Sequence, residues 1–253
     1  MMVPCITAVS WLAGKSLSVA ALRPRWSEPP PRLGRMDRAS ALALFVARGL
    51  LRDDDTAEER EGFGVVLGTE LGCAEVNDQF HRGMLERGVA QASPMLFAQT
   101  IPSAPAGEIA IALGVRGHST TVLAGRCAGL AALIEARRAL ALGRCAVALV
   151  VAGDVVGDDR APWLAGRSAQ EAFVALRLER PDVALARGRR ALGVLVDVRV
   201  ARGVPEAAVP EDHLGASGVL ELARALEAGA EGGAFEVGDA HGFAGVVRFA
   251  RGS

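Results

Sequence analysis

The sequence predicts an α/β layered fold in which helices cover a largely parallel central sheet. Apolar segments of strand length alternate along the chain with Ala/Leu-rich segments of helical periodicity. Residues 146–152 form a continuous apolar run, which is typical of a strand buried on both faces. The chain has 253 residues, of which 51% are hydrophobic, so it is long and apolar enough to bury a sizeable core.

The first third of the chain supplies a strand, a helix and a charged connection. Residues 3–13 are apolar and compatible with a first strand, and residues 38–51 place Ala and Leu at helical spacing. Acidic clusters at 53–55 and 58–61 predict a solvated charged loop. The next expected elements are a buried strand at 64–69, an amphipathic helix at 75–87, a proline-rich loop at 93–107 and a helical turn at 108–113.

The remaining chain repeats one pattern. A β-branched strand at 119–124 precedes an Ala/Leu helix at 128–142, which Gly143 ends. A second such helix at 219–227 is also followed by a glycine and then a strand-like segment, which indicates a duplicated unit. The other expected strands are 172–179, 192–200, 234–237 and 246–249.

Charge and cysteine usage exclude several function classes. The net charge is −1, from 28 basic and 29 acidic residues, so no bulk field attracts nucleic acid or an anionic membrane. The longest uncharged stretch, 88–107, contains three prolines and is no membrane helix. The apolar start lacks a basic region, so we expect no signal peptide. Four widely spaced cysteines without a CxxC motif predict no metal and reduced thiols in the cytoplasm.

One stretch carries a family resemblance. Residues 97–117 read FAQTIPSAPAGEIAIALGVRG and continue into HSTTVLAGRCAGL at 118–130. This resembles the β-ketoacyl synthases of the thiolase superfamily, with a proline-rich loop, an Ala-Gly-x-Ile-Ala turn, an Arg-Gly strand start and a nucleophile elbow. Segments 144–153, 171–179 and 212–218 resemble later parts of the same family in the same order.

The resemblance implies a thiolase-like layered fold with two related βαβ halves. It covers nearly the whole chain, which is little more than half the length of a complete ketosynthase. We therefore expect one truncated domain over 1–253, with a first half at 1–165 and an abbreviated second half at 166–253. The shortening falls between Gly203 and Glu211, where the family carries its His-Gly-Thr motif. The short ketosynthase-like proteins of aryl-polyene-type clusters, some of them similar to chain length factors, share this form.

The family's catalytic residues are replaced in this sequence. A ketosynthase needs a cysteine nucleophile at a helix N-terminus and two histidines that stabilise developing oxyanions. Counting the elbow from both ends places Arg126 at the nucleophile position and leaves Cys127 one residue late. The same count places Asp212 at the second histidine position, with His213 one residue late. His241 stands in the final loop, where it could line a residual pocket.

These positions keep alternatives open. Cys127 is either a small packing residue or a shifted nucleophile, with His213 or His241 as its partner. A cation at a helix N-terminus is unfavourable, so Arg126 is expected to have an acidic or carbonyl partner or to lie at a dimer seam; otherwise it is an incidental surface residue. His213 is expected to be a polar residue at a helix start.

The sequence therefore favours a non-catalytic, chain-length-factor-like subunit that pairs with an active β-ketoacyl synthase. The complex would act in fatty-acid, polyketide or aryl-polyene chain elongation, and acyl carrier protein would reach this chain through the complex. A stand-alone acyltransferase or thioesterase-like enzyme using Cys127, and a homodimeric acyl-binding scaffold, are the alternatives. No cofactor is expected. The resemblance implies that the dimer seam contains Phe97, Ile101, Ser119, Thr120, Thr121 and Val122.

Overall fold

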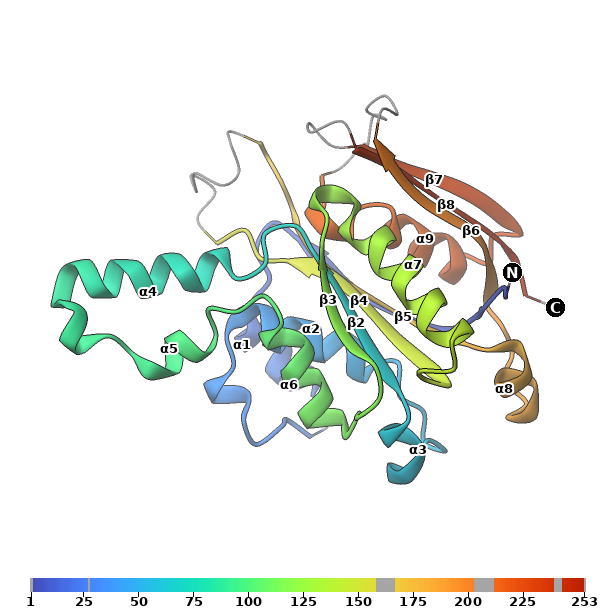
Figure 1. Cartoon of the computed structure of the whole chain (residues 1–253), viewed down its shortest axis with the longest axis horizontal. Coiled ribbons are helices and arrows are strands. Elements are labelled where there is room, and N and C mark those ends of the chain that lie inside the picture. The colour runs from blue at the N-terminus through green and yellow to red at the C-terminus, as the bar shows by residue number, and fades with distance from the viewer. Residues whose placement is uncertain (1, 27, 158–166, 203–211, 239–242, 253) are drawn as a thin grey trace.

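The computed structural model describes residues 2–26, 28–157, 167–202, 212–238 and 243–252. Within them, eight strands form one sheet in the order β3-β2-β4-β5-β1-β6-β8-β7 (Figure 1). The strands are β1 (Cys5–Gly14), β2 (Gly64–Thr69), β3 (Ser119–Leu123), β4 (Val147–Asp154), β5 (Glu171–Glu179), β6 (Gly193–Arg202), β7 (Gly232–Gly238) and β8 (Phe243–Arg251).

Helices cover both faces of the sheet, as the layered fold class requires. They are α1 (Val19–Leu22), α2 (Arg38–Arg48), α3 (Ala57–Glu61), α4 (Ala74–Arg87), α5 (Pro94–Ala98), α6 (Ala104–Leu113), α7 (Ala128–Ala141), α8 (Pro181–Ala186) and α9 (Val219–Glu227). None of the helices in the described ranges is both long and apolar enough to cross a membrane. The boundary expected between residues 165 and 166 lies outside the described residues.

The expectation of a largely parallel sheet is wrong. Only β2 with β3 and β2 with β4 are parallel, and the other neighbouring strands are antiparallel. Parallel strands must be joined by a crossover connection. The segment α4 to α6 provides the crossover from β2 to β3, and α7 provides the crossover from β3 to β4, on the other side of β2. β5 instead runs back beside β4, and β8 runs back beside β7 after a short connection.

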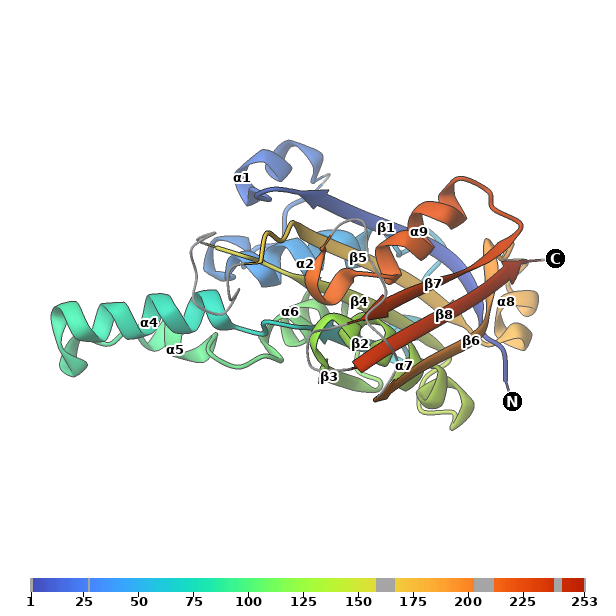
Figure 2. The ribbon, with the colours of Figure 1, turned by 90° about the horizontal axis from the view of Figure 1, so that it is seen from above.

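β1 joins two parts of the sheet. It pairs with β5 from Cys5 to Gly14, but with β6 only at Cys5 and Ile6. Beyond that point the two parts diverge, and α7 and α9 lie between them in contact with strands of both (Figures 1 and 2). One core therefore surrounds α7 and α9, and a second core lies where α2 and α6 cover the opposite face of β2, β4 and β5.

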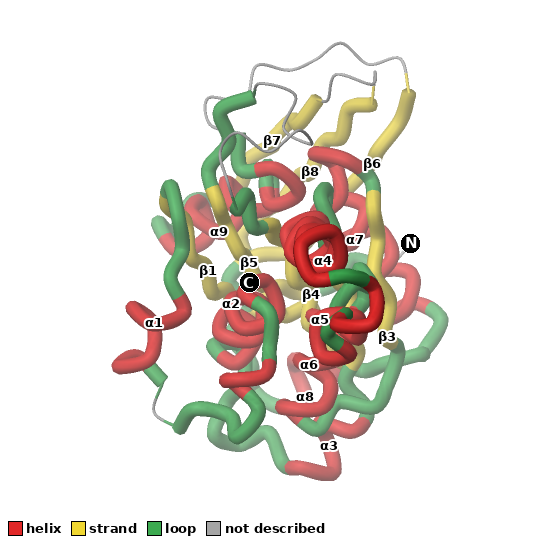
Figure 3. Tube along the Cα trace, turned by 90° about the vertical axis from the view of Figure 1, so that its left-hand side faces the viewer, coloured by secondary structure: helices red, strands yellow, loops and turns green. Residues whose placement is uncertain are grey.

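The proline-rich stretch is not the loop that was expected over 93–107. It contains α5, and α6 begins at Ala104 rather than at residue 108. Pro94 and Pro105 each stand in the first turn of a helix. Proline is accepted there because its missing N–H would have no intrahelical partner. The helices α4 and α5 form an arm that projects from the body of the protein (Figures 1 and 3).

The acidic segment 53–61 is largely exposed, as expected, but it is not a loop throughout, because Ala57–Glu61 form α3. Thr56 and Glu59 cap α3 reciprocally, and Asp55 is buried against β5. There its carboxylate accepts a hydrogen bond from the wholly buried guanidinium of Arg177 at 2.9 Å. A buried arginine requires such a partner, because an uncompensated charge in a core is strongly destabilising.

The start of α7 approaches its neighbours more closely than side chains allow. A Cβ atom on Gly68 would lie 2.5 Å from the carbonyl oxygen of Ala128. One on Gly129 would lie 2.7 Å from the carbonyl oxygen of Gly215 and 3.0 Å from the Cβ of Ala152. Glycine at these positions lets β2, α7 and the turn before α9 touch through their backbones.

This contact predicts the effect of one methyl group. Gly129→Ala is expected to lower the free energy of unfolding by about 1–3 kcal/mol, because the start of α7 must move away from Gly215. Gly107→Ala, in α6, has nothing within 4 Å of the new Cβ and should be neutral or add up to about 1 kcal/mol. Urea unfolding measures both. Equal effects of the two substitutions would contradict the close approach.

Candidate functional site: the elbow before α7

The elbow is a sharp turn from β3 into α7. Gly125 has a positive φ of 54°, and residues Gly125–Cys127 form a single 3₁₀ turn before α7 begins. The turn contacts a second 3₁₀ turn, Leu214–Ala216, which precedes α9. The two turns can lie this close because Gly129 of α7 and Gly215 of the second turn carry no side chains. Residues near 126 and near 213 are therefore neighbours, although they are far apart in sequence.

Arg126 and Asp212 meet at this junction. The Arg126 side chain is 11% exposed, and its Nε lies 3.6 Å from Oδ1 of Asp212, whose side chain is 16% exposed. The acidic partner expected for Arg126 is thus present. The carboxylate offsets the unfavourable position of a cation at a helix start.

The pair belongs to a chain of alternating charges. The other carboxylate oxygen of Asp212 accepts hydrogen bonds from Nε and an Nη of Arg167, at 2.9 and 2.7 Å. Arg167 also binds Glu70, which follows β2, at 2.5 Å. Burial lowers the pKa of Arg167, but its hydrogen bonds to the two carboxylates outweigh this and raise the pKa overall. The ionic cluster Arg126, Asp212, Arg167 and Glu70 has two charges of each sign.

A buried carboxylate at the end of β4 holds the surrounding backbone. Asp154 accepts hydrogen bonds from the hydroxyl of Thr69, from the amides of Glu70 and Leu71 at 3.0 and 2.8 Å, and from the amide of Gly215 at 3.0 Å. Burial raises its pKa to about 6, against these four hydrogen bonds. Asp154 therefore ties the loop after β2 to the turn that carries Asp212.

The candidate thiol and imidazole are both buried. Cys127 has no exposed surface, and its Sγ lies 3.8 Å from the carbonyl oxygen of Val237 on β7. His213 is 2% exposed, and its backbone amide donates to the hydroxyl of Ser217 at 3.1 Å. It directly precedes the 3₁₀ turn before α9. His241 lies outside the described residues.

The residues expected at a dimer seam lie on β3, in α5 and between α5 and α6. Within the described chain β3 is the edge of the sheet and pairs only with β2. Phe97 and Ile101 are 64% and 54% exposed. The side chains of β3 are exposed or half-buried: Ser119, Thr120, Thr121 and Val122, followed by Leu123.

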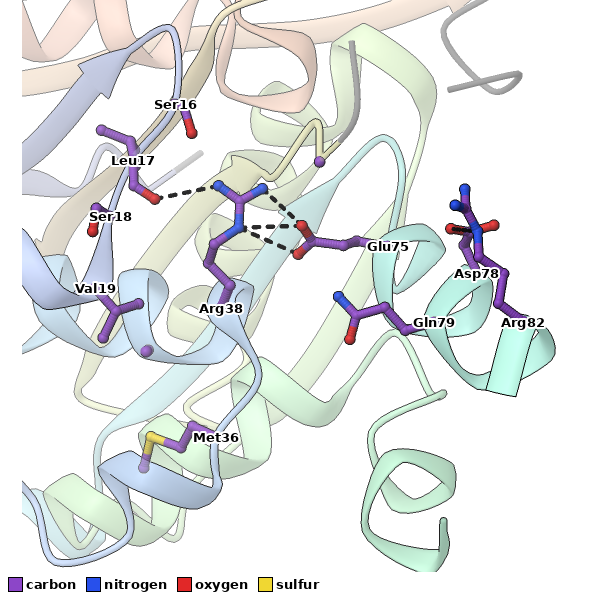
Figure 4. Close-up of a pocket in the computed structure, with 12 residues that line it drawn as sticks. Ser16, Leu17, Ser18, Val19, Met36, Arg38, Glu75, Asp78, Gln79 and Arg82 are labelled. Atoms are coloured by element: carbon purple, nitrogen blue, oxygen red, sulfur yellow. Dashed lines mark hydrogen bonds and ion pairs between the residues drawn. The ribbon is translucent and has the colours of Figure 1, made fainter. Parts of the chain in front are cut away.

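A cavity of about 690 Å³ lies between α1, α2 and α4 (Figure 4). Arg38 stands at its centre and contacts Glu75 at 2.9 Å and the buried Glu171 at 2.7 Å. It also donates to the carbonyl oxygen of Leu17 at 3.2 Å. The two carboxylates neutralise this guanidinium, so the cavity presents no unbalanced arginine to a ligand. Among the described residues no group of three or more His, Cys, Asp or Glu could hold a metal ion.

Sequence reasoning missed three members of this site. Glu70 and Arg167 gave no signal, because their partners are remote in sequence. Asp154 did give a signal in the sequence. A carboxylate that directly follows a continuous apolar strand is buried at the end of the sheet and must find hydrogen-bond donors there. In the structure the donors are a hydroxyl and three backbone amides.

The charge alternation predicts an order of stabilities. Asp212→Asn leaves two guanidinium groups without their shared carboxylate and should lower the free energy of unfolding by about 1–3 kcal/mol. Arg126→Met should cost less, because Asp212 keeps both hydrogen bonds from Arg167. Asp182→Asn is the control and should change stability little, because its ion pair with Arg180 is exposed and screened by solvent. A larger loss for Arg126→Met would contradict the central place of Asp212.

The raised pKa of Asp154 predicts a pH dependence. A folded pKa of about 6, against about 3.9 in an unfolded chain, means that the folded protein binds more protons between these values. The contribution of Asp154 to stability is full below pH 4 and falls by up to about 3 kcal/mol as the pH rises through 6. The difference in unfolding free energy, wild type minus Asp154→Asn, should shrink accordingly from pH 4 to 7. A difference that grows with pH would show that the hydrogen bonds outweigh burial.

Comparison with known proteins gives the same family from sequence and from fold. The family model "Beta-ketoacyl synthase, N-terminal domain" matches residues 13–173. Nodulation protein E of Rhizobium leguminosarum bv. trifolii is 29% identical over 220 residues, which are 85% of this chain and 51% of that protein. A 3-oxoacyl-(acyl-carrier-protein) synthase 2 of Staphylococcus aureus (strain N315) is 28% identical over 108 residues, 40% of this chain and 25% of that enzyme. The chain thus spans about half, or less, of the length of these curated relatives.

Solved structures share the fold. The ishigamide ketosynthase/chain length factor has a TM-score of 0.78 at 20% identity, with 98% of this chain and 99% of that chain covered. The ketosynthase ApeO in complex with its chain length factor ApeC, from Xenorhabdus doucetiae, has a TM-score of 0.67 at 18% identity, with 99% of this chain and 100% of that chain covered. The architecture is therefore thiolase-like, and the chain belongs to the β-ketoacyl synthase family.

Proposed function

We propose that this chain is a non-catalytic, chain-length-factor-like subunit that pairs with an active β-ketoacyl synthase. The observation that carries the proposal is the buried ion pair between Arg126 and Asp212. The family resemblance assigns these two positions to the nucleophile and to a catalytic histidine. If the two catalytic residues had been lost independently, the residues now at these positions would be unrelated to each other. Instead, the two side chains compensate each other's charge.

Neither side chain can perform the chemistry of the residue it replaces. A guanidinium stays protonated in proteins, so Arg126 has no free electron pair with which to attack the carbonyl of an incoming thioester. An ionised carboxylate only accepts hydrogen bonds, so Asp212 would repel a developing oxyanion rather than stabilise it. Arg167 and Glu70 extend the cluster and keep its total charge at zero.

The alternative of an enzyme that uses Cys127 has less support. A thiol attacks a thioester only where the substrate reaches it, and this sulfur is wholly buried beside the backbone of β7. The homodimeric scaffold differs from the favoured proposal only in the identity of the partner. Both need the same uncovered surface.

That surface combines a strand edge with apolar side chains. An unpaired edge such as β3 accepts another chain through main-chain hydrogen bonds. On the projecting arm, Phe97 packs on Phe80 at a ring distance of 5.7 Å but is 64% exposed. Leu85 and Met95 are 87% and 55% exposed. An obligate interface over this edge and arm would bury about 2,000 Å² or more.

The partner classes follow from the named relatives. Two of the similar structures are ketosynthases with chain length factors, and another is a type II polyketide acyl-carrier protein in complex with its ketosynthase. By analogy, the partner of this chain is a full-length ketosynthase, and acyl carrier protein reaches the chain through the complex. The pathway would extend a polyketide, fatty-acid or aryl-polyene acyl chain in the cytoplasm.

Co-expression with a ketosynthase encoded nearby tests the proposal. The wild-type chain should co-purify with it, and Leu123→Arg should abolish or strongly reduce the complex, because this side chain is 55% exposed at the end of the edge strand. Leu142→Arg is the matched control, since Leu142 is equally exposed, at 58%, but lies at the far end of α7. It should leave the complex intact.

Two results would contradict the proposal. One is a wild-type chain that stays monomeric at all concentrations in the presence of the ketosynthase. The other is a stoichiometric acyl adduct on Cys127, seen by intact-protein mass spectrometry after incubation with acyl carrier protein thioesters. A homodimer that Leu123→Arg dissociates would instead support the scaffold alternative.

A further inference from the structure

A second cavity, of about 520 Å³, lies on the side of the sheet away from the ionic cluster. It is formed by α2, α3, α6 and the proline segment 29–31. α2 and α6 pack on the core that they form with β2, β4 and β5, here called the outer core. α7 and the elbow belong to the core around α7 and α9, here called the inner core. The cavity is therefore separate from the position that the family uses for catalysis.

The wall of this cavity is largely apolar. Leu44 and Leu113 are buried in the outer core, and Leu51 packs against it. Ile111 stands nearby and is 62% exposed. A concave apolar surface of this size with a few polar groups is the usual form of a small-molecule site, for which volumes of about 300–1,000 Å³ are typical.

Three arginines line the cavity, and one of them differs from the others. Arg32 is paired with Glu108 at 3.1 Å. Arg48 donates to the backbone carbonyl of Glu28 at 2.5 Å. In the described part of the chain, the guanidinium of Arg60 has no hydrogen bond or ion pair, and its Nε is fully buried. Because Arg60 as a whole is half-buried at the cavity and has no acidic partner among the described residues, its guanidinium is suited to an acceptor that enters the cavity.

We propose that the cavity binds an amphiphilic carboxylate, with its apolar chain against Leu44, Leu51 and Leu113 and its carboxylate on Arg60. The charges favour an anion, because the three lining arginines exceed the two lining glutamates. Oε1 of Glu108 is paired with Arg32, although its Oε2 is buried without a hydrogen-bond partner. An arginine fork matches a carboxylate geometrically, and partial burial strengthens the hydrogen bonds. A cationic amphiphile would meet the same wall but an unfavourable charge.

Calorimetry on the purified full chain tests this site. Dodecanoate below its micelle concentration should bind one molecule per chain, at least tenfold more tightly than dodecyltrimethylammonium. Arg60→Gln should weaken dodecanoate binding at least tenfold and leave the melting temperature unchanged, because Arg60 has no partner to lose. Arg60→Lys should bind dodecanoate more weakly than the wild type but more tightly than Arg60→Gln, because it keeps the charge and loses the fork. Arg144→Gln, an exposed arginine outside the cavity, should change neither property.

Three outcomes would overturn the inference: no binding of dodecanoate, equal binding of the anionic and cationic amphiphiles, or an affinity that Arg60→Gln leaves unchanged. Ile111→Asp adds a second check, since a charge at the apolar wall should weaken binding without loss of a core side chain. The test uses the isolated chain, so it is independent of whether a ketosynthase partner exists.

Discussion

The backbone contact at the start of α7 determines what the rest of the site can be. Gly68, Gly129 and Gly215 allow β2, α7 and the turn before α9 to meet without side chains between them. Asp154 then fastens the same junction through four hydrogen bonds. Because these parts come from both ends of the sheet, the contact also brings Arg126 to Asp212. The elbow geometry of an enzyme thus persists in a chain whose elbow carries a guanidinium.

Buried charge is handled in the same way on both sides of the sheet. In the outer core, Arg177 is neutralised by Asp55 and Glu179. At the elbow, Arg126 and Arg167 share Asp212. A buried pair adds little net stability compared with an apolar pair, but removal of one partner is costly. Once both arginine and aspartate are present at the elbow, reversion of either one alone is therefore unfavourable. This physical coupling makes the two residues hard to replace one at a time.

The sequence identified most elements but not their partners. Continuous apolar runs predicted β2 and β4, and helical spacing predicted α2, α7 and α9, because burial on given faces leaves a local pattern. Strand direction was not predictable from such patterns, and the β4–β5 pair is antiparallel. Pro94 and Pro105 looked like loop residues because composition does not show that a proline begins a helix. The Asp55–Arg177 pair joins residues 122 positions apart, a separation that no local pattern encodes. At the elbow, the count assigned Arg126 and Asp212 to two positions of the family pattern, but only the structure could show that they meet and that Glu70 and Arg167 lie beside them.

The C-terminal end of β3 and its open edge have opposite properties. At its C-terminal end the elbow is held by ion pairs and backbone contacts among the described residues. Along its open edge and on the neighbouring arm, the backbone groups and the side chains of Phe97 and Ile101 remain uncovered. Exposed apolar surface of this kind is unfavourable in water unless another chain covers it. The proposed pairing would cover this edge and these side chains, so the uncovered surface supports the proposal that another chain binds here.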